Sequence, residues 1–285
     1  MLALLTLTLV ACNKDDDGGT DDPIISEPTP GYSFFVAGHT YGNAVNFQFG
    51  LHPPVKEHFA FINDYPAMRF GVLTGDVVPA PSQEYWDAAL VDLSSFTMPI
   101  HVAAGNHDRG PVFESIYQHD YYSFQNGKDL FIILNPTSWN IQGDQKAFLE
   151  QTLADNAEKV NNIFLFCHEL IWWAPDSIFG NVEINYRPHY PGSTNFWPEI
   201  HPILDALPNN VVFFAGDLGA TAEVDHYTYF KKDNVTLIGT GMGGGSEDNI
   251  VVVEVHSPTD VRFKLLGINA DTPYELGILE DYILP

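Results

Sequence analysis

Residues that could ligate a metal ion recur in this sequence at one kind of position, directly after a short apolar run. Aspartate, asparagine and histidine supply oxygen and nitrogen donors that first-row divalent metal ions accept. Alone, each such position is ordinary turn chemistry. Because parallel strands bring their carboxyl ends to one edge of a sheet, we expect these runs to deliver their polar residues to one site. The positions are His39, Asp76, the GNHD segment of residues 105–108, His168 and Asp217.

The apolar runs have the length and composition of β-strands, and they alternate with amphipathic stretches. This alternation is typical of helices and strands packed around mixed sheets. The last third of the chain carries little helix, so we predict one domain of the α/β (α+β) class, with two mixed sheets packed as a sandwich and flanked by helices. The expected strands span 32–37, 69–74, 99–104, 129–135, 162–167, 211–215, 235–240, 249–255 and 261–268, and the expected helices span 55–65, 82–95, 143–159 and 197–207.

The order of these polar segments resembles the calcineurin-like metallophosphoesterases, which include the purple acid phosphatases. Their motif series reads Asp-x-His, Gly-Asp, Gly-Asn-His-Asp/Glu, His and Gly-His-x-His. Here Gly75-Asp76 matches the second motif, residues 105–108 match the third, and His168 matches the fourth. The third motif is the specific one, and the resemblance spans residues 32–245. It implies a metallophosphoesterase-like fold and a metal-dependent phosphoesterase.

The first and last motifs depart from that pattern. The first reads Ala37-Gly38-His39, without the carboxylate, and the last reads Gly216-Asp217-Leu218-Gly219, without either histidine. By the resemblance, one metal position keeps Asp76, Asn106 and His168, and Asp217 substitutes an oxygen for a nitrogen. The other position keeps only His39 and the shared Asp76, so we expect one ion, and a second would need a further ligand from Glu169, His189, Asp225 or His226. The oxygen-rich set favours Mn²⁺, Mg²⁺, Ca²⁺ or iron over Zn²⁺.

The resemblance also implies roles for residues around the metal. His107, oriented by Asp108, would be the acid that protonates the leaving group, and a structural capping residue is the alternative. His39 would contact phosphate or water. Arg109 is a candidate to bind a substrate phosphate because arginine matches phosphate geometry, and a solvated surface arginine is the alternative.

The charge of the chain limits its partners. Twelve Lys and Arg residues oppose 37 Asp and Glu residues, which gives a formal net charge of −25. Such a chain would repel the backbone of a nucleic acid, so we expect no nucleic-acid partner. A small phosphorylated substrate is compatible with this charge if a bound metal ion offsets the field.

The N-terminus predicts a membrane anchor. Residues 1–11, MLALLTLTLVA, are too short to span a bilayer and run into Cys12. The sequence LVAC resembles a bacterial lipobox, which implies a signal peptide at 1–11 and lipidation of Cys12; a plain secretory signal is the alternative. Residues 12–31 then form an acidic, disordered tether, and 32–285 form the metallophosphoesterase-like domain. The implied location is the bacterial cell envelope, at the outer membrane. Exposure of the protein on the cell surface is implied only by a weaker resemblance of the segment after Cys12 to a surface-export signal.

Together these features predict a metal-dependent hydrolase of phosphate mono- or diesters, anchored to a bacterial membrane. The alternative is a binding protein on the same fold, which lost catalysis with its missing ligands. Asp217 favours the enzyme, because a protein without a metal centre has no need of a metal-binding side chain at that position.

Overall fold

In a computed structural model of the protein, the described residues are 29–45, 47–188, 194–282 and 284. The expectations for the signal peptide at 1–11, for Cys12 and for His189 lie outside these residues. The described chain forms two six-stranded sheets with helices beside them, which confirms the predicted fold class. Among the described residues, no helix is both long and apolar enough to cross a membrane.

The first sheet is mixed. Its strand order is β12-β11-β10-β1-β2-β3, with β1, β2 and β3 parallel and the remaining pairings antiparallel. Its parallel half matters for the site, because β2 and β3 end next to the predicted metal ligands. The strands are β1 (Tyr32–Ala37), β2 (Met68–Thr74), β3 (Ile100–Ala103), β10 (Asn249–Ser257), β11 (Asp260–Gly267) and β12 (Tyr274–Ile278).

The second sheet is mixed as well, with the order β4-β5-β6-β7-β9-β8. Its four central strands are parallel, and β4 and β8 close the two edges in antiparallel pairings. The strands are β4 (Tyr122–Asn126), β5 (Asp129–Ile133), β6 (Asn162–Phe166), β7 (Asn210–Gly219), β8 (Tyr227–Lys232) and β9 (Val235–Met242).

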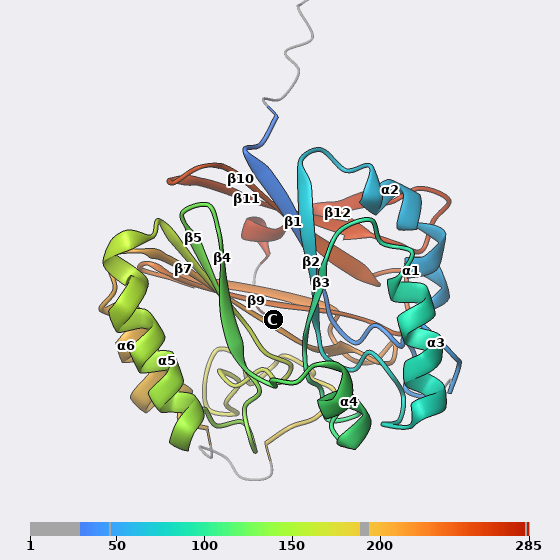
Figure 1. The fold of residues 1–285 in the computed structure, drawn as a ribbon, viewed down its shortest axis with the longest axis horizontal. Coiled ribbons are helices and arrows are strands. Elements are labelled where there is room, and N and C mark those ends of the chain that lie inside the picture. The colour runs from blue at the N-terminus through green and yellow to red at the C-terminus, as the bar shows by residue number, and fades with distance from the viewer. Residues whose placement is uncertain (1–28, 46, 189–193, 283, 285) are drawn as a thin grey trace, which may run out of the picture.

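Helices cover the outer faces, with α1, α2 and α3 along one flank and α5 and α6 along the other (Figure 1). The helices are α1 (Pro53–Glu57), α2 (Phe59–Asn63), α3 (Gln83–Leu93), α4 (Pro111–Ile116), α5 (Gly143–Asn156) and α6 (His201–Asp205). Ser82 caps α3 by accepting the amide of Tyr85 at 3.4 Å. The single helix expected at 55–65 is wrong, because the backbone of His58, with φ −107° and ψ 10°, departs from helical values and separates α1 from α2. The His58 ring donates to the Ile268 carbonyl at 2.9 Å.

The expected helix at 197–207 also differs from the structure. It consists of a π-helical turn at Phe196–Ile200 followed by the short helix α6. The expected helix at 143–159 ends at Asn156 and continues as a 3₁₀ turn, Ala157–Lys159. The strands β4, β8 and β12 were not predicted, because they lie at sheet edges and carry mixed, partly exposed residues.

The inner core lies between the sheets. Phe34 of β1 contacts Phe164 of β6 edge-to-face, with ring centroids 5.1 Å apart, and it stacks on Phe70 of β2 at 5.2 Å. Phe166 stacks on Phe214 at 5.3 Å within the second sheet. Aromatic pairs in these geometries contribute beyond their buried area, so this layer fixes how the two sheets sit against each other.

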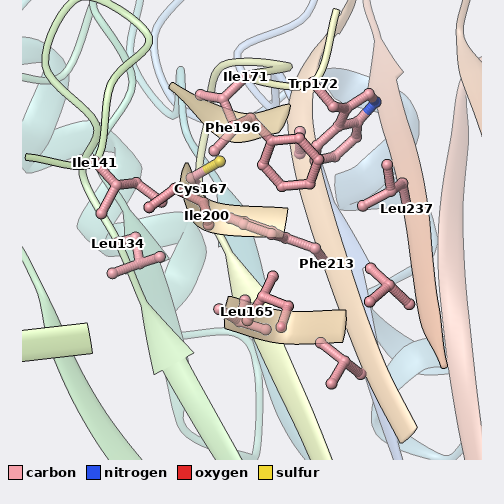
Figure 2. Close-up of a cluster of buried hydrophobic side chains, with 14 of the residues drawn as sticks. Leu134, Ile141, Leu165, Cys167, Ile171, Trp172, Phe196, Ile200, Phe213 and Leu237 are labelled. Carbon is pink, nitrogen blue, oxygen red and sulfur yellow. The ribbon is translucent and has the colours of Figure 1, made fainter. Parts of the chain in front are cut away.

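A second core lies between the second sheet and its helices. Figure 2 shows this cluster, in which Leu165 and Cys167 point the same way as Phe213 and Leu237. Side chains alternate across a strand, so the chain that places Ile163, Leu165 and Cys167 outward directs Phe164 and Phe166 inward. The next inward position after Phe166 is His168.

Candidate metal centre

Three buried side chains converge where β2, β6 and β7 end. Nε2 of His168 lies 3.4 Å from Oδ1 of Asp76 and 3.7 Å from Oδ1 of Asp217. One donor atom from each of the three residues lies within 4.8 Å of the other two. This is the spacing at which a single cation can contact all three, and their role as ligands stays a prediction.

His168 is aimed by the alternation of β6 and by one backbone contact. Its Nδ1–H donates to the carbonyl of Thr74 at 2.9 Å, so Nε2 faces the two carboxylates. A hydrogen bond at one ring nitrogen is the usual way in which proteins orient a metal-binding imidazole. Because Thr74 belongs to the first sheet and His168 follows a strand of the second, this bond also joins the two sheets.

Asp76 sits in a tight turn after β2, with a positive φ of 52°. Its Oδ1 accepts the amide of His107 at 3.1 Å. Its Oδ2 is buried and has no hydrogen-bond partner among the described residues. A buried carboxylate oxygen without a partner is costly, so this atom points to a bound group that supplies the missing positive charge.

Asp217 reaches the site through a bulge in β7. The pairing of β7 with β9 shifts register between Ala215 and Leu218. The amides of Gly216 and Asp217 both bond to the carbonyl of His168, at 2.9 and 3.0 Å. A bulge of this kind redirects one side chain out of the regular alternation, and here it turns Asp217 toward His168.

Asn106 and His39 complete the surroundings of the three donors. Oδ1 of Asn106, which is solvent-exposed, lies 3.1 Å from Nε2 of His168. His39 is fully buried, and its Nε2 lies 3.6 Å from Oδ2 of Asp76. The structure therefore brings the four predicted ligands together, and His39 borders them on the Oδ2 side of Asp76.

Charge in the site is arranged around the carboxylates. Burial raises the pKa of Asp217 to about 7, although His168 acts in the opposite direction. Burial alone would lower the pKa of His168, but the carboxylates of Asp76 and Asp217 outweigh it and raise the pKa to about 10. Burial lowers the pKa of His39 to about 4, so its ring is neutral near pH 7. The carboxylates thus favour a positive charge at His168 Nε2, and a divalent cation bound there would release this proton.

The expected pairing of His107 with Asp108 is wrong. Nδ1–H of His107 donates to the Pro79 carbonyl at 2.8 Å, so a backbone group orients the ring. Asp108 is buried and accepts three backbone amides: Val77 and Val78 at Oδ1 and Gly105 at Oδ2, at 2.8, 3.1 and 2.8 Å. Because the loop amides occupy both oxygens, Asp108 shapes the loops that carry Asp76 and Asn106 and does not face the His107 ring.

Arg109 is held in a network beside the site. Its Nη2 pairs with Glu169 at 2.8 Å, and its Nε donates to Asn135 at 2.8 Å. Nη2 also reaches the Pro136 carbonyl at 3.2 Å. These contacts position the guanidinium for structural reasons, and its contact with a substrate phosphate stays a prediction.

The backbone at position 219 does not accommodate the histidine that the last motif would place there. Gly219 has a φ of +78°, and a Cβ atom added there would come within 2.4 Å of the Met242 amide nitrogen. A histidine therefore does not fit at this position without a backbone shift. Asp225 and His226, which could have supplied replacement ligands, are instead engaged with the Glu183 amide at 2.8 Å and with Asp248 at 3.3 Å.

Sequence reasoning missed one residue of the site. Nδ2 of Asn185, in the long segment after His168, donates to Oδ1 of Asp217 at 3.1 Å and lies 3.5 Å from Nε2 of His39. Long connecting segments are often functional, but nothing in the local pattern singles out this asparagine. Its place depends on how the segment folds back across the edge of the second sheet.

Comparison with solved structures supports the same architecture. The chain is similar to a purple acid phosphatase from yellow lupin (Lupinus luteus) seeds, with a TM-score of 0.60 and 14% identity over 86% of this chain and 52% of that chain. The chain thus spans about half the length of that enzyme. It therefore has the calcineurin-like metallophosphoesterase fold, as its motif order predicts, and an identity of 14% shows the fold alone.

Two further solved structures align over similar shares of this chain. A predicted phosphoesterase from Streptococcus pneumoniae gives a TM-score of 0.39 and 10% identity, over 86% of this chain and 97% of that chain. Vps29 from Chaetomium thermophilum gives 0.37 and 7%, over 85% of this chain and 92% of that chain. Comparison with protein-family models and with curated protein sequences finds no match.

Proposed function

We propose that this protein is a metal-dependent hydrolase of phosphate mono- or diesters that works with one divalent cation. The observation that carries the proposal is the convergence of Asp76, His168 and Asp217 at one buried point. These residues come from three different strand ends, and ordinary turn chemistry gives no reason for them to meet. The solved structures with this fold include a phosphatase, which agrees with the proposal at the level of the fold.

The donor set fits a divalent cation. Asp76 offers a buried oxygen that lacks a partner among the described residues, and Asp217 offers a second carboxylate. Asn106 adds a neutral oxygen on the solvent side, and His168 adds the nitrogen Nε2. Three oxygens and one nitrogen favour Mn²⁺, Mg²⁺, Ca²⁺ or iron over Zn²⁺, which accepts nitrogen and sulfur more readily.

The chemistry divides between the cation and this chain's own residues. A bound divalent cation would polarise a phosphoryl oxygen and lower the pKa of a bound water. His107 is half-buried, and because Nδ1–H is held by Pro79, its Nε2 is the atom available to deliver a proton to the leaving oxygen. Tyr41 packs between His107 and His39, with ring centroids 5.3 and 4.5 Å away, and limits how far the two rings move.

The experiment that tests this proposal uses the purified full-length chain, stripped of metal by a chelator. Mn²⁺, Mg²⁺, Ca²⁺, Fe²⁺ and Zn²⁺ are added back singly, and hydrolysis of p-nitrophenyl phosphate and bis-p-nitrophenyl phosphate is followed. We expect hydrolysis with at least one of the ions. Asp76→Asn and His168→Ala should abolish it, whereas the exposed His119→Ala should leave it unchanged.

The outcomes separate the two functions considered for this fold. Turnover that depends on metal and on Asp76 supports the hydrolase. Absence of turnover of either ester with every ion identifies the alternative, a ligand-binding protein on the same fold. A chain that binds none of these ions contradicts the hydrolase.

We also propose that the protein is anchored to the bacterial cell envelope through a lipid at Cys12. The support is the sequence of residues 1–12 alone. Labelling of the expressed protein with a radioactive fatty acid should depend on Cys12, and Cys12→Ala should move the protein from the membrane fraction to the soluble fraction. Retention of the Cys12→Ala variant in the membrane would contradict the anchor.

A further inference from the structure

The carboxamide of Asn185 lies among metal-type donors. Its Nδ2 donates to Asp217 Oδ1 at 3.1 Å and approaches His39 Nε2 to 3.5 Å. The same His39 Nε2 lies 3.6 Å from Asp76 Oδ2. Asn185 therefore contacts one carboxylate oxygen and one imidazole nitrogen, and that nitrogen in turn lies near the Asp76 carboxylate.

The segment that carries Asn185 is fixed by its neighbours. Ile184 is buried in the outer core of the second sheet, and the Val182 carbonyl accepts the indole N–H of Trp173 at 3.1 Å. Glu183 and Asp225 bond reciprocally: the Glu183 amide donates to the Asp225 carboxylate, and the Asp225 amide donates to the Glu183 carbonyl, both at 2.8 Å. The asparagine side chain is thus held against Asp217 by a packed and hydrogen-bonded segment.

An amide NH₂ and a cation compete for the same lone pairs. The NH₂ group of Asn185 carries two donors, and the atoms that it faces are acceptors when His39 is neutral. A second cation that contacted both His39 Nε2 and Asp217 Oδ1 would have to lie where the NH₂ group meets these two atoms.

The residues around this position agree with that interpretation. Ala37 and Gly219 offer no donor there, and the Gly219 backbone leaves no room for a Cβ atom. The side of the site next to His168 keeps its full set of four donors. The two sides are therefore unequal, and Asn185 lies on the depleted one.

We propose that Asn185 takes the place of a second cation, so that its carboxamide satisfies His39 and Asp217 by hydrogen bonding and limits the centre to a single ion. This inference rests on the proposed function, since it assumes that the first ion is bound by Asp76, Asn106, His168 and Asp217. Asn185 acts as a positioning residue: it sets the number of metal ions without touching the reacting phosphate.

The test is the metal stoichiometry of the full-length chain with Mn²⁺, measured by titration calorimetry and by elemental analysis after dialysis. Wild-type protein should bind one ion. Asn185→Asp, which replaces the NH₂ donors with an oxygen of similar size, should bind two, and paramagnetic resonance should show two coupled Mn²⁺ ions. Asn185→Ala, which only removes the amide, should bind a second ion more weakly. Asn181→Asp is the matched control: the same change at an exposed position beside Tyr229 and Phe230 should leave one ion.

The results distinguish the two proposals. If wild-type protein binds one ion and both Asn185→Asp and Asn185→Ala also bind one ion, the role of Asn185 is overturned and the single-ion function stays intact. Wild-type protein that binds two ions also overturns that role. Wild-type protein that binds no ion removes the proposed function and the inference with it. A variant that fails to fold is recognised by circular dichroism, and the other variant then decides.

Discussion

Asp217 meets His168 twice, through its backbone and through its side chain. Its amide donates to the His168 carbonyl at 3.0 Å, and its Oδ1 lies 3.7 Å from Nε2 of the same residue. The bulge that makes the first contact also directs the second. The position of the carboxylate therefore depends on the backbone geometry of β7 at Gly216 and not only on the residue type at 217.

This dependence can be tested at Gly216. A Cβ atom there would come within 2.1 Å of the Thr74 carbonyl oxygen, so Gly216→Ala forces the two sheets apart at the site. We expect a loss of about 3 kcal/mol in the free energy of unfolding, typical of overpacking, together with weaker Mn²⁺ binding. Urea unfolding and calorimetry measure the two effects.

Gly127→Ala is the control for that experiment. Gly127 also has a positive φ, but no atom lies within 4 Å of a Cβ added there. The Gly127→Ala substitution should lower the free energy of unfolding by about 1 kcal/mol, because a left-handed backbone is unfavourable for alanine. It should leave Mn²⁺ binding unchanged. Equal effects of the two substitutions would show that close packing at Gly216 does not matter.

The metal preference should follow the side chain at position 217. Asp217→His replaces an oxygen donor with a nitrogen donor, so we expect the affinity for Zn²⁺ to rise relative to that for Mn²⁺. Competition between the two ions, followed by elemental analysis, measures the ratio. Asp217→Asn keeps an oxygen but removes the charge, so it should weaken both ions without reversing their order. An unchanged ratio in Asp217→His would exclude residue 217 as a ligand.

His107 should matter most for substrates with poor leaving groups. A general acid contributes about a hundredfold or more when the leaving oxygen needs a proton, and little when it leaves as a stable anion. His107→Ala should therefore reduce kcat for an alkyl phosphate far more than for p-nitrophenyl phosphate, with metal stoichiometry unchanged. Equal losses for the two substrates would assign His107 a structural role.

Asp248 should make stability depend on pH. Its Oδ1 accepts the amides of Gly243 and Gly244 at 2.8 and 3.1 Å, and its Oδ2 lies 3.0 Å from Nε2 of His52. Burial alone would raise the pKa of Asp248, but the hydrogen bonds from His226, His52 and these amides outweigh it and hold the pKa well below its usual range. A carboxyl with a depressed pKa in the folded state stabilises the protein above its unfolded pKa of about 4, and this stabilisation is lost as the pH falls further.

Asp248→Asn tests the sign of that effect. The variant should be less stable than wild type by about 1–3 kcal/mol at pH 7, because it leaves buried amide donors less well paired. The difference should shrink as the pH is lowered below about 4, because the Asp248 carboxyl of the unfolded wild-type chain then becomes protonated while that of the folded chain stays ionised. Urea unfolding at pH 7 and at acidic pH measures it. A difference that is constant with pH would show that the charge of Asp248 contributes nothing.

Much of the site could be predicted because it depends on local pattern. The apolar runs before Asp76 and His168 have strand length, so the sequence places both residues at strand ends. The expectation of a single sheet edge is wrong, because β2 lies in the first sheet and β6 in the second, and the local pattern does not show that these two edges meet. The alternation along β6 also separates Cys167, in the core, from His168, in the site. These features can be predicted from the length of the apolar runs and from the alternation of side chains along a strand.

The remaining features depend on contacts between distant segments. The sequence predicts that the carboxylate of Asp108 pairs with the adjacent His107. In the folded chain this carboxylate instead accepts hydrogen bonds from the loop amides of Val77 and Val78. Asn185 enters the site because Ile184 is buried and Glu183 bonds Asp225, and neither contact has a local signature. The break between α1 and α2 lies at His58, whose ring donates to the carbonyl of Ile268, far along the chain.

The bond from His168 to the Thr74 carbonyl crosses from one sheet to the other, and the predicted ligands also come from both sheets. A cation bound by Asp76 and Asp217 would link the two sheets of the sandwich. Its binding energy would then add to the cohesion of the whole domain, so the melting temperature should rise with the concentration of free metal and fall on chelation.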